Sequence, residues 1–167
     1  APFEAAGDTI LWKPGIRLDW KDFRGKPPVP ANFSAQSNCI YTLRTVPSFS
    51  NDTLILTEIL TPCFTRNASW VLPDSKQDSL LQHEQLHFDL CELYGRKFRK
   101  TLTEQSWSIL HFDRQVNELF GKMWNEYRAA QDTYDEETQH GLVRDKQLEW
   151  MGSVNRELTE LGAFYQD

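Results

Sequence analysis

The stretch Leu80–Asp89 reads LLQHEQLHFD, and its central five residues, HEQLH at positions 83–87, decide how the rest of the chain is interpreted. Residues four apart on an α-helix lie about one turn apart on the same side. The imidazoles of His83 and His87 can therefore converge on one cation. Glu84 lies about 100° around the helix from His83, from where its carboxylate can reach a water on that cation. The spacing predicts a zinc site that activates a water, with Glu84 as general base.

A helix is expected around this motif, because apolar residues recur every three or four positions from residue 74 onward. The first helix is predicted to begin at Asp74 or Ser75 and to run to about residue 100. Its end carries a basic cluster at residues 96–100, which is expected to be solvated and to complement the helix dipole. Two further apolar stripes predict helices from about 108 to 127 and from about 145 to 164.

The first seventy or so residues show the shorter alternation that is typical of strands and loops. Strands are predicted at Thr9–Trp12, Ile16–Trp20, Gln36–Thr45 and Thr53–Leu60. Asn51-Asp52 would turn a hairpin between the last two, and Pro62 would end the second, because proline cannot donate to a ladder. These elements predict one α+β domain over residues 1–167. Its small, largely antiparallel N-terminal sheet would pack against three long helices in a zincin-like fold.

The composition limits the classes of function. With 40% hydrophobic and 25% charged residues and a net charge of −6, the chain is typical of a globular domain with no basic stripe for nucleic acid. No run of about 18 apolar residues is present, so no transmembrane segment is expected. The chain opens at Ala1-Pro2 rather than at Met, as a processed product would, and this start is compatible with export.

Three cysteines, Cys39, Cys63 and Cys91, form no CxxC pair, so a cysteine-based zinc site is not supported. A Cys39–Cys63 disulfide would require the two flanking strands to be neighbours. Cys91 continues the four-residue series of His83 and His87, but two helical turns rise about 11 Å, too far for one ion to be shared by all three. Cys91 is therefore interpreted as a packing residue.

A catalytic zinc usually has three protein ligands and a water, so a third ligand must come from elsewhere in the chain. A metzincin-type extension would place Gly three residues after His87 and His or Asp six after, where this chain has Leu90 and Leu93. The third ligand is thus expected further downstream. His140 is the preferred candidate, because it lies in a polar cluster just before a glycine that lets the backbone turn. Asp135 is the alternative, and His111 is disfavoured.

The segment around these candidates can also supply supporting groups. If His140 is the ligand, Asp135, Glu136 or Glu137 would instead orient one of the imidazoles through its other nitrogen. Tyr134 is a candidate catalytic residue, because its hydroxyl could donate to the oxyanion of a tetrahedral intermediate. The alternative for Tyr134 is an aromatic residue that ends the apolar stripe of the second helix.

These segments together resemble a known family. They are Leu18–Gly25 (LDWKDFRG), Ser69–Val71 (SWV), Leu80–Asp89, Tyr134–Gly141 (YDEETQHG), Gln147 and Trp150. With them the chain resembles bacterial domain-of-unknown-function family 922, described as predicted secreted zinc-dependent proteases. The resemblance implies a secreted or periplasmic bacterial protein. It also implies His83 and His87 as zinc ligands, Glu84 as base and the Tyr134–Gly141 segment as the remainder of the site.

The sequence therefore predicts a zinc-dependent metallohydrolase, most simply a peptidase acting on a peptide or protein substrate. The alternative is a non-catalytic secreted module that binds a metal or a partner protein. A third interpretation is a metallohydrolase that cleaves a non-protein amide, such as a cell-envelope peptide. Glu84 argues against the non-catalytic alternative, because a structural metal site has no use for a carboxylate between its histidines.

Overall fold

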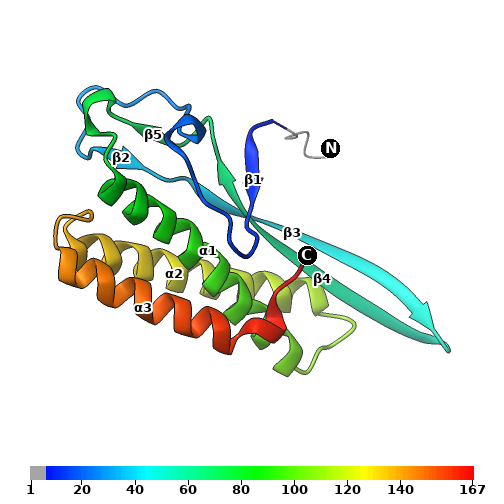
Figure 1. The fold of residues 1–167 in the computed structure, drawn as a ribbon. Coiled ribbons are helices and arrows are strands. Elements are labelled where there is room, and N and C mark those ends of the chain that lie inside the picture. The colour runs from blue at the N-terminus through cyan, green and yellow to red at the C-terminus, as the bar shows by residue number, and fades with distance from the viewer. Residues whose placement is uncertain (1–6) are drawn as a thin grey trace.

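The computed structural model describes residues 7–167, which form three helices and five strands (Figure 1). The helices are α1 (Asp78–Glu104), α2 (Phe112–Thr138) and α3 (Arg144–Glu160). The strands are β1 (Thr9–Leu11), β2 (Ala35–Gln36), β3 (Cys39–Ser50), β4 (Thr53–Thr65) and β5 (Trp70–Val71). Short 3-10 turns occupy Trp20–Asp22, Pro73–Ser75 and Gly162–Phe164. The prediction of an α+β fold with small antiparallel sheets and three helices is confirmed.

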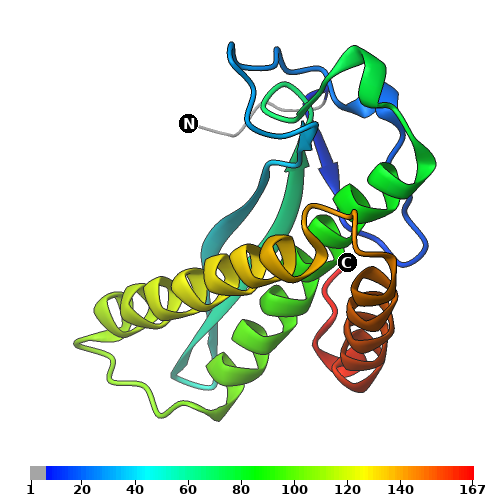
Figure 2. The same ribbon diagram turned by 90° about the vertical axis from the view of Figure 1, so that its left-hand side faces the viewer.

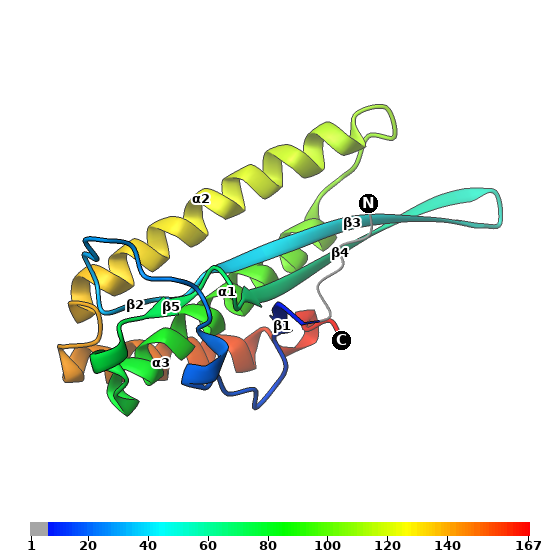
Figure 3. The same ribbon diagram turned by 90° about the horizontal axis from the view of Figure 1, so that it is seen from above.

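The larger sheet has the order β1-β4-β3, and both of its pairings are antiparallel. Asn51 and Asp52 turn the β3–β4 hairpin with φ values of 48° and 63°, as a tight hairpin turn requires. Figure 3 shows this hairpin reaching past the helices, and at its tip Phe49 is 79% exposed. The base of the hairpin packs on α1 instead, with Leu60 and Phe64 fully buried.

Pro62 does not end the second strand, which was predicted to stop there and continues to Thr65. The carbonyl of Pro62 accepts a hydrogen bond from the amide of Trp12, just after β1. In an antiparallel strand the N–H and C=O of one residue point toward the same neighbour. The nitrogen of Pro62, which has no hydrogen, therefore faces the β1 side, as its carbonyl does. Pairing with β3, where Pro62 lies opposite Tyr41, therefore loses no hydrogen bond.

Two other predicted strands differ from the structure. Ile16–Trp20 is a loop that leads into a 3-10 turn, because the Asp19 and Asp22 side chains bond to backbone amides and close a capping box. The predicted strand Gln36–Thr45 is interrupted at Ser37 and Asn38, between β2 and β3. Asn38 donates its amide to the Ser69 hydroxyl, and Ser37 bonds to α1 instead of to a strand.

Helix α1 is the central element of the molecule, and Figure 2 shows α2 and α3 on either side of it. One face of α1 buries Phe88, Cys91 and Phe98 against the sheet and α2. Another face buries Leu86, Leu90 and Leu93 against α3 and Tyr134. Within residues 7–167, no helix is long and apolar enough to cross a membrane.

The basic cluster at the end of α1 was expected to be solvated, but half of it is buried. Arg96 and Arg99 are 5% and 4% exposed, and both bond to the carboxylate of Glu92, which is 1% exposed. Arg96 also donates to the carbonyl of Leu158, and Arg99 to that of Leu60. The cluster therefore ties α1 to both α3 and the sheet through charge-assisted hydrogen bonds.

Replacing Glu92 by Ala should lower the free energy of unfolding by about 3 to 5 kcal/mol, because two buried guanidinium groups lose their counter-charge. Urea denaturation measures the change. The matched control is Glu104→Ala, whose pair with Lys100 spans 3.9 Å and whose side chain is 62% exposed. The control should cost less than about 0.5 kcal/mol. Equal costs for the two variants would contradict a structural role for the buried cluster.

Candidate metal centre

The centre forms where the first half of α1 passes the end of α2. His83 and His87 project from α1, and Asp135 projects from α2. Asp135 Oδ1 lies 2.9 Å from His83 Nε2 and 3.0 Å from His87 Nε2. The two Nε2 atoms are 3.1 Å apart. Three atoms that can each bind a cation thus form a triangle with sides of about 3 Å.

Each imidazole is oriented from behind by a glutamine side chain. His83 Nδ1 lies 3.1 Å from Gln147 Oε1, and His87 Nδ1 contacts Gln131 Oε1. An amide oxygen only accepts hydrogen bonds, so each Nδ1 carries a proton and donates it. In neutral imidazoles the lone pairs are then on the Nε2 atoms, which face each other and the Asp135 carboxylate. Such a triangle of lone pairs repels itself unless a positive charge lies within it.

The neighbouring charges and hydrogen bonds shift the pKa values of His87 and Asp135. Burial alone would lower the pKa of His87, but the hydrogen bond to Asp135, the charges of Glu84 and Asp135 and the bond to Gln131 raise it to about 9. Burial would raise the pKa of Asp135, yet hydrogen bonds from His83 and His87 hold it well below its usual range. The surroundings thus favour positive charge at His87 and negative charge at Asp135.

The dimensions of the triangle fit a zinc ion. Tetrahedral zinc with nitrogen and oxygen ligands at about 2.0–2.2 Å separates neighbouring ligand atoms by about 3.3–3.5 Å. The observed separations of 2.9–3.1 Å are only a few tenths of an ångström shorter. The donor set, two neutral imidazoles and one carboxylate, is also a common one for zinc.

His140, the preferred third ligand in the sequence analysis, lies at the rim of the centre. Its Nδ1 is 3.4 Å from Asp135 Oδ1, and possible ligand atoms of His83, Asp135 and His140 all lie within 4.8 Å of one another. The His140 side chain is 43% exposed, and its ring packs on Phe33 at 4.3 Å between centroids. The structure thus brings both candidate third ligands to the motif on α1. Asp135 contacts both histidines, whereas His140 lies at the rim and pairs with Asp135.

Residues 139–141 form a left-handed turn that ends α2 and carries His140. Gln139 and His140 both have positive φ, and Gln139 ends α2 by donating its amide to carbonyls of the last turn. Gly141 follows with φ +84°, and a Cβ there would lie 2.9 Å from His83 Cβ. A side chain is therefore excluded, and the turn packs directly against His83.

Glu84 is 2% exposed and lines a groove of about 310 Å³ together with His87, Asp135 and His140. Ser37 donates its hydroxyl to Glu84 Oε2 at 2.6 Å. The Oε2 atom is thus held from the β2–β3 connection, which leaves Oε1 as the carboxylate oxygen without this restraint. The groove places the predicted base beside the candidate metal-binding side chains.

Tyr134 lies behind the centre, on its buried side. It is 0% exposed, its ring stacks on His83 at 4.6 Å, and its hydroxyl donates to Gln147 Oε1 at 2.8 Å. This position supports His83 and the glutamine that orients it. The predicted contact of the Tyr134 hydroxyl with an oxyanion stays a prediction. His111, at the N-terminal end of α2, is exposed.

The cysteines lie outside the centre. All three are buried free thiols, and Ile40 rather than Cys39 is the register partner of Cys63, so the Cys39–Cys63 disulfide is not formed. Burial and the neighbouring Cys91 raise the pKa of the Cys39 thiol well above its usual value. Burial likewise raises the pKa of Cys63 to about 11. Protonated thiols of this kind serve as packing residues.

The comparisons with known proteins concern this same part of the chain. The model of a family described as "Bacterial protein of unknown function (DUF922)" matches residues 65–141. The match supports a relationship of residues 65–141 to this family. It contains α1, α2 and the turn after α2, and thus four of the side chains at the centre: His83, His87, Asp135 and His140. No curated protein and no solved structure gives a significant match.

Substituting Gly141 by Ala should lower the free energy of unfolding by about 2 kcal/mol, because the residue has a left-handed backbone and the new methyl group meets His83. Thermal or urea denaturation of the metal-free protein measures this effect. Gly121→Ala in α2 is the control, since a Cβ there meets nothing within 4 Å. The control should be stabilised by about 0.5–1 kcal/mol. A stabilised Gly141→Ala variant would contradict the close packing described here.

Proposed function

We propose that this protein is a zinc metallohydrolase of the peptidase type, with His83, His87 and Asp135 as zinc ligands and Glu84 as general base. The observation that carries the proposal is the triangle of two Nε2 atoms and one carboxylate oxygen with sides of 2.9–3.1 Å. Glu84 lines the same groove and does not belong to the triangle. A carboxylate in that place has a use in hydrolysis and none in holding a structural ion.

Zinc in such a site would polarise a carbonyl and lower the pKa of its water to about 7. The chain's own residues would do the rest. Glu84 would accept a proton at Oε1, because Oε2 is held by Ser37, and would pass it to the leaving amine. Gln147 and Gln131 would keep the imidazoles in the tautomer that presents Nε2.

A non-catalytic metal-binding module is the second candidate, and one observation favours it. His140 lies close enough to Asp135, at 3.4 Å, to join the other three side chains as a fourth ligand. Four protein ligands would fill a tetrahedral ion and leave no position for water. The coordination number of the bound ion therefore distinguishes the two candidates.

A peptide or protein substrate and a secreted or periplasmic location belong to the same proposal. They are supported by the hydrolytic arrangement of Glu84 and by the family resemblance. A cell-envelope peptide would fit both. The net charge of −6 gives no support for nucleic acid as a substrate.

Metal analysis of the purified protein should find one zinc per chain, and substitution should identify the third ligand. Asp135→Ala should weaken zinc binding by more than the 10- to 100-fold that losing a supporting residue typically costs. His140→Ala should weaken it by less than about 10-fold, because His140 lies at the rim. Competition with a chromophoric chelator measures both affinities. The opposite order would make His140 the ligand, and an absence of zinc in the wild type would overturn the metal site itself.

Glu84→Gln should keep zinc and lose at least about 100-fold of any hydrolytic turnover, since general-base catalysis contributes at least this factor. A screen of quenched fluorescent peptides provides the activity, and metal analysis of the same samples provides the occupancy. Glu118→Gln is the control, because its side chain is 71% exposed on α2. Equal turnover by Glu84→Gln and the wild type would contradict the role of Glu84.

A further inference from the structure

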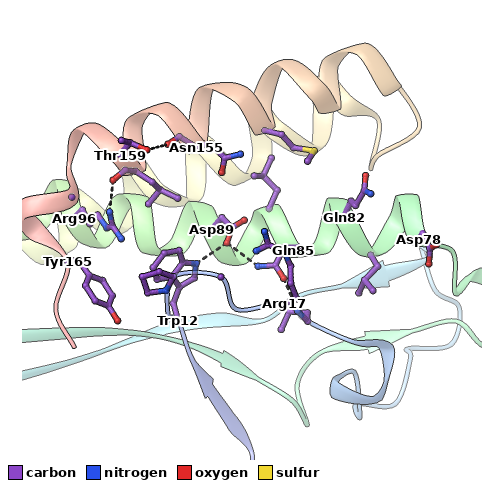
Figure 4. Close-up of a pocket in the computed structure, with 18 residues that line it drawn as sticks. Trp12, Arg17, Asp78, Gln82, Gln85, Asp89, Arg96, Asn155, Thr159 and Tyr165 are labelled. Atoms are coloured by element: carbon purple, nitrogen blue, oxygen red, sulfur yellow. Dashed lines mark hydrogen bonds between the residues drawn. The ribbon is translucent and has the colours of Figure 1, made fainter.

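A second and larger cavity lies on the other side of α1 (Figure 4). Its volume is about 1000 Å³, and it is bounded by α1, α3, the loop after β1 and the C-terminal segment. His87 and Asp89 are two positions apart, so they point about 200° apart around the helix. The cavity is therefore separated from the metal centre by α1. We call it the α1–α3 groove.

Asp89 occupies the middle of this groove and has one oxygen with no partner. Its Oδ1 accepts hydrogen bonds from Trp12 Nε1 at 2.9 Å and from Gln85 Nε2 at 3.0 Å. Its Oδ2 accepts none from any residue in the described part of the chain, and in Figure 4 it points toward the space between α1 and α3. A half-buried carboxylate oxygen in such a place lacks the donor or cation that normally compensates it.

The two arginines that line the groove make no direct bond to Asp89. Arg17 donates to the carbonyl of Ile16. The guanidinium of Arg96 bonds to Glu92 and Leu158 and lies over the rings of Trp12 and Tyr165. The positive charge of Arg17 favours the ionised form of Asp89, but neither arginine bonds to Asp89 within residues 7–167. The hydrogen-bond donor that complements Oδ2 would therefore have to come from a ligand.

The walls around Asp89 are suited to an apolar body. Leu81 and Leu86 line the groove from α1, and Met151 and Leu158 line it from α3. Polar side chains also line the groove, and among them the side-chain amide of Asn155 has no hydrogen bond to a described residue. A cavity of this volume that combines apolar walls with polar groups is within the range of small-molecule sites.

We propose that the α1–α3 groove binds an organic primary ammonium, in which the ammonium bonds to Asp89 Oδ2 and an apolar body packs between α1 and α3. The charge of the ligand complements the carboxylate of Asp89, which the fold leaves half-paired. A neutral alcohol would make a weaker hydrogen bond, and a carboxylate would be repelled. The proposal does not depend on zinc, because it uses residues on the opposite face of α1.

The test is a titration of the full chain with n-hexylammonium, n-hexanol and n-hexanoate in the presence of a chelator. The indole N–H resonance of Trp12, identified with Trp12→Phe, reports on the groove because that N–H is bonded to Asp89. Hexylammonium should shift this resonance saturably and bind at least about 10-fold more tightly than hexanol, as expected for a charge-assisted hydrogen bond. Hexanoate should not bind.

Asp89→Asn should remove that preference and leave the affinity for hexanol within about two-fold, because the amide keeps the shape but not the charge. If this variant does not fold, Asn155→Trp serves instead: residue 155 is exposed at the groove, and the larger ring should block both ligands. Equal affinities for ammonium and alcohol, no shift at Trp12, or unchanged ammonium binding in the variants would overturn the proposal. Loss of zinc binding elsewhere would leave these results unaffected.

Discussion

Helix α1 is covered on two sides by other elements, and the rest of the structure depends on this constraint. A helix exposed on one side needs one apolar stripe, but α1 buries one face against the sheet and another against α3. Its remaining polar positions are therefore enclosed by neighbours and must find partners there. His83, Glu84 and Glu92 are each at most 2% exposed. His83 and Glu84 bond to side chains from other elements. Glu92 bonds to Arg96 and Arg99 of α1, and these in turn bond to α3 and the sheet. The candidate metal centre is one result of this enclosure, and the cluster of Glu92, Arg96 and Arg99 is another.

Sequence periodicity identified the three helices because their apolar positions repeat over many turns, which few other structures can satisfy. It failed where short-range side-chain bonds decide the backbone, as at Asp19 and Asp22, whose capping box replaces a predicted strand. It also failed for Pro62, where only the pairing partner shows which side lacks an N–H. The burial of Arg96 and Arg99 could not be read from a helix end alone, since it depends on α3 and the sheet covering that end.

The centre was predictable only in part. The HEQLH spacing fixes the geometry of His83 and His87 within one helix, and the polar cluster after residue 133 identified the segment that meets them. Whether Asp135 or His140 lies nearer to the two histidines was not predictable, because it depends on where α2 ends. Since Gln139 leaves the helix with a left-handed backbone, Asp135 still projects from the last turn while His140 lies beyond it.

Of the supporting residues, only Gln147 carried a sequence signal, as one residue of the family resemblance. The chemistry of all three bears on the proposed function. Ser37 and Gln131 belong to no motif, and Ser37, Gln131 and Gln147 come from three separate segments. Gln131 and Gln147 are neutral amides, where carboxylates often orient metal-binding histidines. A Zn²⁺ ion held by two imidazoles and one carboxylate would keep a net charge of about +1, and neutral amides behind the histidines would not reduce it. A partly buried site with that charge favours developing negative charge on a bound oxygen. The choice of glutamine at both positions therefore suits a hydrolytic centre better than a purely structural one, which gains most from full neutralisation of its ion.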